Sequence, residues 1–260
     1  MIFRVLKINV ILAFLTFLPI KAYSEFQKET KLIDSGKCEE ALLENKLTGE
    51  ENEKKFNPKK TFVGKHVIKI FRVYTINRRI NILKNNCKRV DEAFELAKKS
   101  LELEKKLFKI PEKEFDKALQ YDEFQRKKNL ADAYSRVADF YNDSGNYKEG
   151  IKYYKKNIEI YESVDPLNKG NLLNYNYSIL SGLYNRTGEL QNANQYKQKH
   201  LKYLGLRFGK KTKEYFDALF DVFYQYQDQG YYDFALDILK EINQTIDTST
   251  YYADDSFGEL

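Results

Sequence analysis

The residues that could carry catalytic or metal chemistry are few and widely separated. The chain of 260 residues has two histidines, His66 and His200, and two cysteines, Cys38 and Cys87. This set cannot supply a four-cysteine zinc site, and the histidines lie in unrelated segments. The sequence also lacks HExxH, GxGxxG, GxxxxGK[ST] and GxSxG patterns, so zinc-protease, phosphate-cradling and hydrolase chemistry have no support. We therefore expect no enzyme, no cofactor and no metal site.

The composition indicates a folded, helix-rich chain. Hydrophobic residues make up 42%, charged residues 32% and aromatic residues 15%. This balance excludes both an intrinsically disordered chain and a multi-pass membrane protein. The four prolines leave long stretches in which helices can run without interruption.

The N-terminus has the layout of a secretory signal peptide. Arg4 and Lys7 precede an apolar run over 8–20, and small residues flank Tyr23. We expect cleavage after Ser24, a secreted or periplasmic location and no stable membrane insertion. A retained anchor is the alternative, although 13 residues between Lys7 and Lys21 fall short of the roughly 20 that span a bilayer.

Loss of residues 1–24 lowers the formal charge. It removes three of 44 cations and no acid, which leaves 41 cations against 38 anions, or +3 instead of +6. The remaining charges are mixed along the chain, so we expect no nucleic-acid partner.

The strongest signal is an internal repeat. Three segments align without gaps: AYSRVADFYNDSGNYKEGIKYY, NYSILSGLYNRTGELQNANQYK and ALFDVFYQYQDQGYYDFALDIL, starting at Ala133, Asn176 and Ala218. In each, four largely apolar or aromatic residues stand at i, i+3, i+4 and i+7, which is one face of a helix. A glycine follows four residues later (Gly145, Gly188, Gly230) and can take the positive φ that ends a helix. Strands are the rival interpretation, but period-2 alternation is absent.

This block resembles the tetratricopeptide (TPR) repeat. The glycines are 43 and 42 residues apart, which is similar to the elongated repeats of kinesin light chains rather than the usual spacing of 34. The resemblance implies an all-α, right-handed superhelical solenoid of antiparallel helix pairs. It covers 131–246 well and 25–110 poorly.

The predicted organisation follows from these matches. It comprises a signal peptide (1–24), a degenerate first repeat (25–48), a loop (49–60), a second degenerate repeat (61–110), a connecting helix (111–127), three TPR-like repeats (128–246) and a C-terminal tail (247–260). In the second repeat, helix A is expected within 66–83 and the turn at 84–86, where no glycine stands.

The resemblance also implies a function, namely non-enzymatic binding of a peptide or partner helix in a groove lined by the first helix of each pair. Carrying over the family's groove positions gives Ser135, Asp139, Asn142, Tyr175, Ser178, Asn185, Phe220, Tyr224 and Gln227. These positions lack the cationic clamp that some family members use for a peptide carboxylate, so an anionic terminus is not the expected ligand. Two alternatives remain open: a merely solvated groove, and a secreted effector or toxin-like protein with its activity in 49–127.

Cys38 and Cys87 form an even pair that an oxidising compartment would join. Each lies near a turn that precedes a second helix, although their offset leaves open whether the Cα atoms come within about 7 Å. The alternative is two small, unpaired core residues.

Overall fold

The fold is taken from a computed structural model that describes residues 28–55, 67–111, 121–164 and 173–245. The chain divides into two compact units, 1–140 and 141–260. Each unit is described by itself. The predicted signal peptide, the expected anchor and the C-terminal tail lie outside the described residues.

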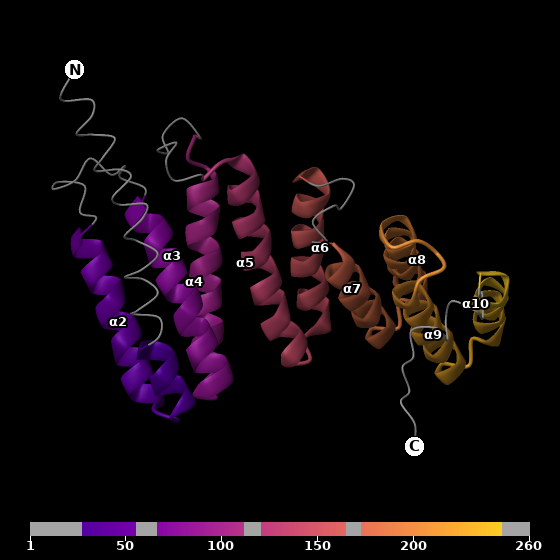
Figure 1. The fold of residues 1–260 in the computed structure, drawn as a ribbon, viewed down its shortest axis with the longest axis horizontal. Helices are drawn as coiled ribbons and strands as arrows, with labels where there is room; N and C mark the ends of the chain where they lie inside the picture. The colour runs from indigo at the N-terminus through magenta and orange to yellow at the C-terminus, as the bar shows by residue number, and fades with distance from the viewer. Residues whose placement is uncertain (1–27, 56–66, 112–120, 165–172, 246–260) are drawn as a thin grey trace, which may run out of the picture. The chain divides into compact units, whose positions relative to one another are not determined.

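The first unit is built from antiparallel helices (Figure 1). Residues 28–34 are helical, and after a turn at Gly36 comes α2 (Cys38–Lys55). Next are α3 (Val67–Asn81), the π-helix η1 (Ile82–Asn86), α4 (Val90–Phe108) and most of α5 (Glu123–Asp143). Helix α3 packs against both α2 and α4.

The second unit continues the pattern. The end of α5 leads through Gly145 into α6 (Tyr147–Val164), which is followed by α7 (Asn174–Arg186), α8 (Leu190–Arg207), α9 (Lys213–Asp228) and α10 (Tyr232–Thr245). Each helix from α6 to α10 packs on the next. The described residues are helices and turns without a strand, which confirms the predicted all-α class.

The predicted glycine turns are present. Gly145, Gly188 and Gly230, together with Gly36 of the first hairpin, have φ between +73° and +78°. In each of the last three hairpins the residue after the glycine donates its N–H to the carbonyl five residues earlier, as Glu189 does to Tyr184 at 2.8 Å. This bond satisfies a carbonyl that the helix end leaves open. The glycine therefore fixes where each helix pair turns.

The second hairpin reaches the same turn without glycine. Lys88 takes φ +57°, and Arg89 N–H bonds Leu83 O at 2.9 Å across six residues instead of five. The single π-helical turn η1 accommodates the additional residue. The prediction of a turn at 84–86 is therefore wrong, because η1 includes these residues and the chain reverses at Lys88.

Two predicted boundaries are also wrong. The loop expected over 49–60 begins later, because α2 continues to Lys55 through residues that favour helix and are held by an ion pair from Glu53 to Arg72 at 2.7 Å. Gly49 belongs to this helix, where a Cβ would lie only 2.9 Å from Thr75 Cγ2 of α3.

The connecting helix expected over 111–127 is the second misplaced boundary. Residues 123–127 are the first part of α5, and residues 112–120 lie outside the description. Asp122 Oδ1 accepts the backbone N–H of Gln125 at 2.8 Å. This side-chain cap begins the helix at Glu123.

The helix faces predicted from the repeat form the core. Val137 and Ala138, Leu180 and Ser181, and Leu219 and Val222 are all buried. Ser181 Oγ donates to Ala193 O at 3.0 Å, so the small residue of the first helix lies directly against the small residue of the second. Such close approach is what small side chains at both positions permit.

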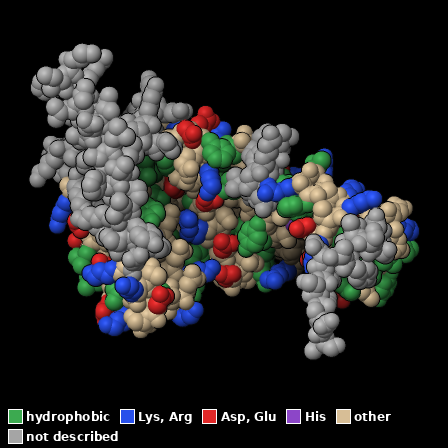
Figure 2. Space-filling view, viewed as in Figure 1, with side chains coloured by type: hydrophobic (Ala, Val, Ile, Leu, Met, Phe, Trp, Pro, Cys, Tyr) green, Lys and Arg blue, Asp and Glu red, His purple; other side chains and the backbone are tan. Residues whose placement is uncertain are grey.

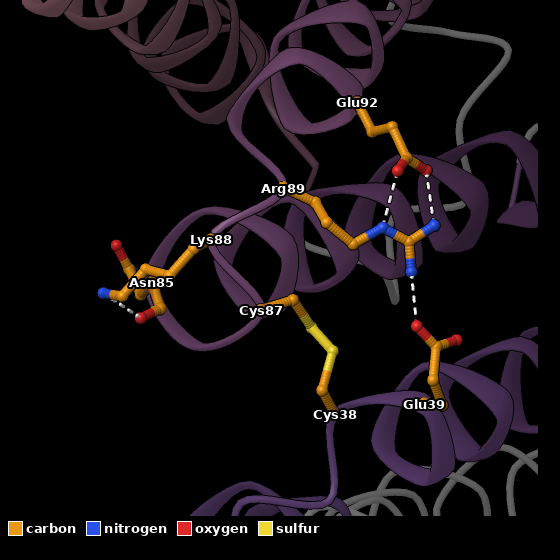
Figure 3. The surroundings of a disulfide bond; sticks show 7 residues. All are labelled: Cys38, Glu39, Asn85, Cys87, Lys88, Arg89 and Glu92. Atoms are coloured by element: carbon orange, nitrogen blue, oxygen red, sulfur yellow. Dashed lines mark hydrogen bonds and ion pairs between the residues drawn. A yellow bond between two sulfur atoms is a disulfide. The ribbon is translucent and has the colours of Figure 1, made fainter.

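A disulfide joins α2 to the turn after η1 (Figure 3). The Cα atoms of Cys38 and Cys87 are 5.6 Å apart. This distance, which the sequence alone does not decide, is within the limit of about 7 Å for a disulfide. Beside it, Arg89 pairs with Glu92 through two nitrogens and with Glu39 of α2 at 2.6 Å. The start of α2 is therefore tied to the turn that precedes α4 by one covalent and one ionic link.

Candidate functional site: the groove of the first helices

The turn geometry supplies the register of the second hairpin. Leu83 accepts the turn hydrogen bond that Tyr141, Tyr184 and Tyr226 accept in later hairpins. Lys84 therefore occupies the position of Asn142, Asn185 and Gln227. Because η1 inserts a residue between Leu83 and Lys88, counting back from Lys88 in the sequence does not find this position.

This register explains a hollow in the first unit, which we call the groove hollow. Its volume is about 290 Å³. Its lining comes from the end of α3 with η1 and from one face of α5: Ile80, Asn81, Lys84, Asn85, Asp132, Ser135, Arg136, Asp139 and Phe140. The predicted groove residues Ser135 and Asp139 are among them. The first helices of two consecutive hairpins thus face one concave, mainly polar site.

Both signs of charge line the groove hollow. Lys84 Nζ lies 4.7 Å from the centre of the Phe140 ring. Burial lowers the pKa of the Arg136 guanidinium, while the nearby carboxylates of Asp132 and Asp139 act to raise it. Two cations and two anions balance, so the site has no net attraction for an anionic peptide terminus. Asn81 and Asn85 add exposed amides that can both donate and accept.

The second unit holds the remaining predicted groove residues. Tyr175 and Tyr224 are 66% and 56% exposed, and Ser178 and Gln227 are also exposed. A further three, Asn142, Asn185 and Phe220, are half-buried. These side chains lie on α7, α9 and the end of α5, and Phe220 also packs against the hydrophobic core of the last helices.

Sequence reasoning missed most of the lining, including the polar residues Asn81, Lys84, Asn85 and Arg136. The first three lie in the hairpin in which η1 inserts one residue before the turn. The sequence marks this turn only by a Lys–Asn–Asn run without glycine. Arg136 follows the predicted groove residue Ser135 on α5, and both residues line the hollow.

Two further properties concern the described residues only. They contain no group of three or more His, Cys, Asp or Glu side chains placed to hold a metal ion. None of their helices combines the length and the apolar character needed to cross a bilayer.

Comparison with solved structures identifies similar folds. The chain is similar to a crystal structure of kinesin light chain nearly identical TPR-like repeats from Podosopora anserina, with a TM-score of 0.61 and 12% identity, over 92% of this chain and 99% of that one. It is also similar to BtubC (BKLC) from P. vanneervenii, with a TM-score of 0.55 and 12% identity, over 89% and 76% of the two chains. No protein-family model and no curated sequence matches. At this identity the likeness establishes the fold, a solenoid of TPR-like helix pairs.

Proposed function

We propose that this TPR-like repeat protein is a non-enzymatic scaffold that binds a peptide or a partner helix along the first helices of its hairpins. The observation that carries the proposal is the groove hollow, in which α3 with η1 and α5 present amides, a hydroxyl and balanced charges to one concave site. Amide side chains suit a peptide backbone because they pair with both its N–H and its C=O. The comparisons support a scaffold fold.

The test starts from peptides selected from a random displayed library against the chain without residues 1–24. We expect the double variant Asn85→Ala with Ser135→Ala to weaken their binding at least tenfold, since each lost ligand hydrogen bond contributes on the order of 1 kcal/mol. Asn185→Ala with Tyr224→Ala tests the second unit in the same way. Neither pair belongs to a buried core face, so the melting temperature should change little.

The matched control is Gln191→Ala with Gln195→Ala. Both residues are exposed on α8, which is the second helix of its hairpin and so is not part of the proposed groove. This variant should bind the selected peptides as the unmodified chain does. Equal loss in all three variants, or unchanged affinity in both groove variants, would place the binding site elsewhere.

We also propose that the protein works in an oxidising compartment, secreted or periplasmic. The joined Cys38 and Cys87 support this location, because disulfides rarely persist in a reducing cytosol. The intact mass of protein from its native source tests it. Two free thiols would contradict the oxidising location, and a mass that includes residues 1–24 would contradict cleavage after Ser24.

A further inference from the structure

The first half of α6 carries a row of lysines that the groove does not use. Lys148, Lys152, Lys155 and Lys156 are all exposed and stand at i, i+4, i+7 and i+8, which places them on one side of the helix. We call these four residues the lysine stripe. Helix α6 is the second helix of its hairpin, so the stripe is not part of the groove of first helices.

A hollow lies along the lysine stripe within the second unit. Its volume is about 470 Å³, and it is lined by all four lysines with Ile151, Glu159, Tyr184 and Glu189. Four cations thus face two carboxylates around a concave surface, and one of the four, Lys152, also pairs with Glu149 of its own helix at 3.3 Å. Figure 2, by contrast, shows the two signs of charge interspersed over the described residues of the face in view.

We propose that the lysine stripe binds an extended acidic segment of a partner polypeptide. Along the helix, Lys148, Lys152 and Lys156 rise by four residues each, which is about 6 Å per step. In an extended chain every second side chain points the same way, at about 6.6 Å per step. Acidic residues at alternate positions therefore match three lysines over about 12 Å.

The neighbouring groups favour a peptide over a nucleic acid. Single strands are held by base stacking on accessible aromatic rings as well as by cations. The ring that lines this hollow, Tyr184, is 5% exposed and stacks on Tyr196 with ring centres 5.7 Å apart. Glu159 and Glu189 would repel a backbone that carries charge at every step, whereas a peptide can place neutral residues beside them.

The test measures binding of two labelled nine-residue peptides of Glu and Ser by fluorescence anisotropy. One has Glu at every second position, and the other has the same Glu residues in one block. We expect the alternating peptide to bind at least threefold more tightly, because a block points half of its carboxylates away. Binding should weaken as salt is raised, since the pairs are exposed.

Lys148→Gln, Lys152→Gln and Lys156→Gln together should weaken the alternating peptide about tenfold. Lys202→Gln, Lys211→Gln and Lys213→Gln remove the same charge from exposed positions outside the hollow and should change affinity less than twofold. Replacement of the three stripe lysines by arginine should preserve binding, and this variant keeps the test valid if the glutamine variant folds poorly.

Three results would overturn the proposal: equal affinity for both peptides, equal effects of the two glutamine variants, or tighter binding of an oligothymidylate of the same charge. The last result would assign the stripe to nucleic acid. The groove variants of the proposed function serve as a further control, and they should leave binding of the acidic peptide unchanged.

Discussion

At the scale of single residues, Lys197 is the clearest exception to the repeat pattern. It is 3% exposed within α8, and its ammonium has no hydrogen-bond partner among the described residues. Its nitrogen lies 3.9 Å from the centre of the Tyr226 ring, whose hydroxyl donates to Asn194. Burial lowers the pKa of Lys197 to about 8. A charge in this position lowers the stability of the fold.

We therefore predict that Lys197→Met stabilises the protein at pH 7 by roughly 2 kcal/mol. Between pH 8 and the ordinary lysine pKa of 10.5, the unfolded chain binds more protons than the folded one. The stability of the unmodified protein should accordingly rise with pH across this interval, and the variant should lack that rise. Denaturant unfolding at several pH values measures both effects.

Lys202→Met is the control, because Lys202 is exposed on the same helix. Its stability should stay within about 0.5 kcal/mol of the unmodified protein, as surface changes usually do. A similar gain in both variants would mean that burial of Lys197 is not the cause.

At the scale of elements, Lys88 reverses the chain with a positive φ, as glycine does in the other hairpins. Lys88 takes φ +57°, and its Nζ donates to Asn85 O at 2.7 Å. Lys88→Gly and Lys88→Ala both lose that hydrogen bond, but only glycine adopts a positive φ without strain. We predict that the glycine variant is more stable than the alanine variant by about 1 kcal/mol.

The same pair of substitutions at Lys99, in the middle of α4, should give the opposite order, with alanine more stable by about 0.5–1 kcal/mol. Thermal or denaturant unfolding compares the four variants. Equal stability of Lys88→Gly and Lys88→Ala would show that residue 88 does not hold a left-handed turn in solution.

The sequence predicted elements best where the local signal repeats. The glycines marked three hairpins, and spacing over one helix face identified their cores. It failed at η1, because one inserted residue moves Lys84 to a groove position without leaving a recognisable motif. It also ended α2 early, because the polar run of Glu, Lys and Asn before Pro58 indicates a loop, whereas Glu and Lys also favour helix. The groove hollow therefore became visible only with the structure.

At the scale of the whole molecule, solenoids are stabilised by contacts between neighbouring helices, so the effect of a local link stays local. The link between Cys38 and Cys87 closes a separation of 49 residues in the first unit. In the chain-entropy account this stabilises by roughly 4 kcal/mol. We predict that Cys38→Ser with Cys87→Ser speeds amide hydrogen exchange in α2 and α3 and leaves exchange in α9 and α10 unchanged.

Reductant added to the unmodified protein is the matched control, and it should reproduce the exchange pattern of the double variant. If exchange in α2 and α3 is faster in the variant but not in the reduced protein, the serine side chains cause the faster exchange and the missing disulfide does not.

The most direct test of the central claim is amide hydrogen exchange of the chain with and without a library-selected peptide. Our account predicts that the bound peptide slows exchange mainly in the first helices of the hairpins, α3 with η1, α5, α7 and α9. Slower exchange confined to the second helices, α4, α6, α8 and α10, would contradict the claim that the polypeptide partner is held in the groove.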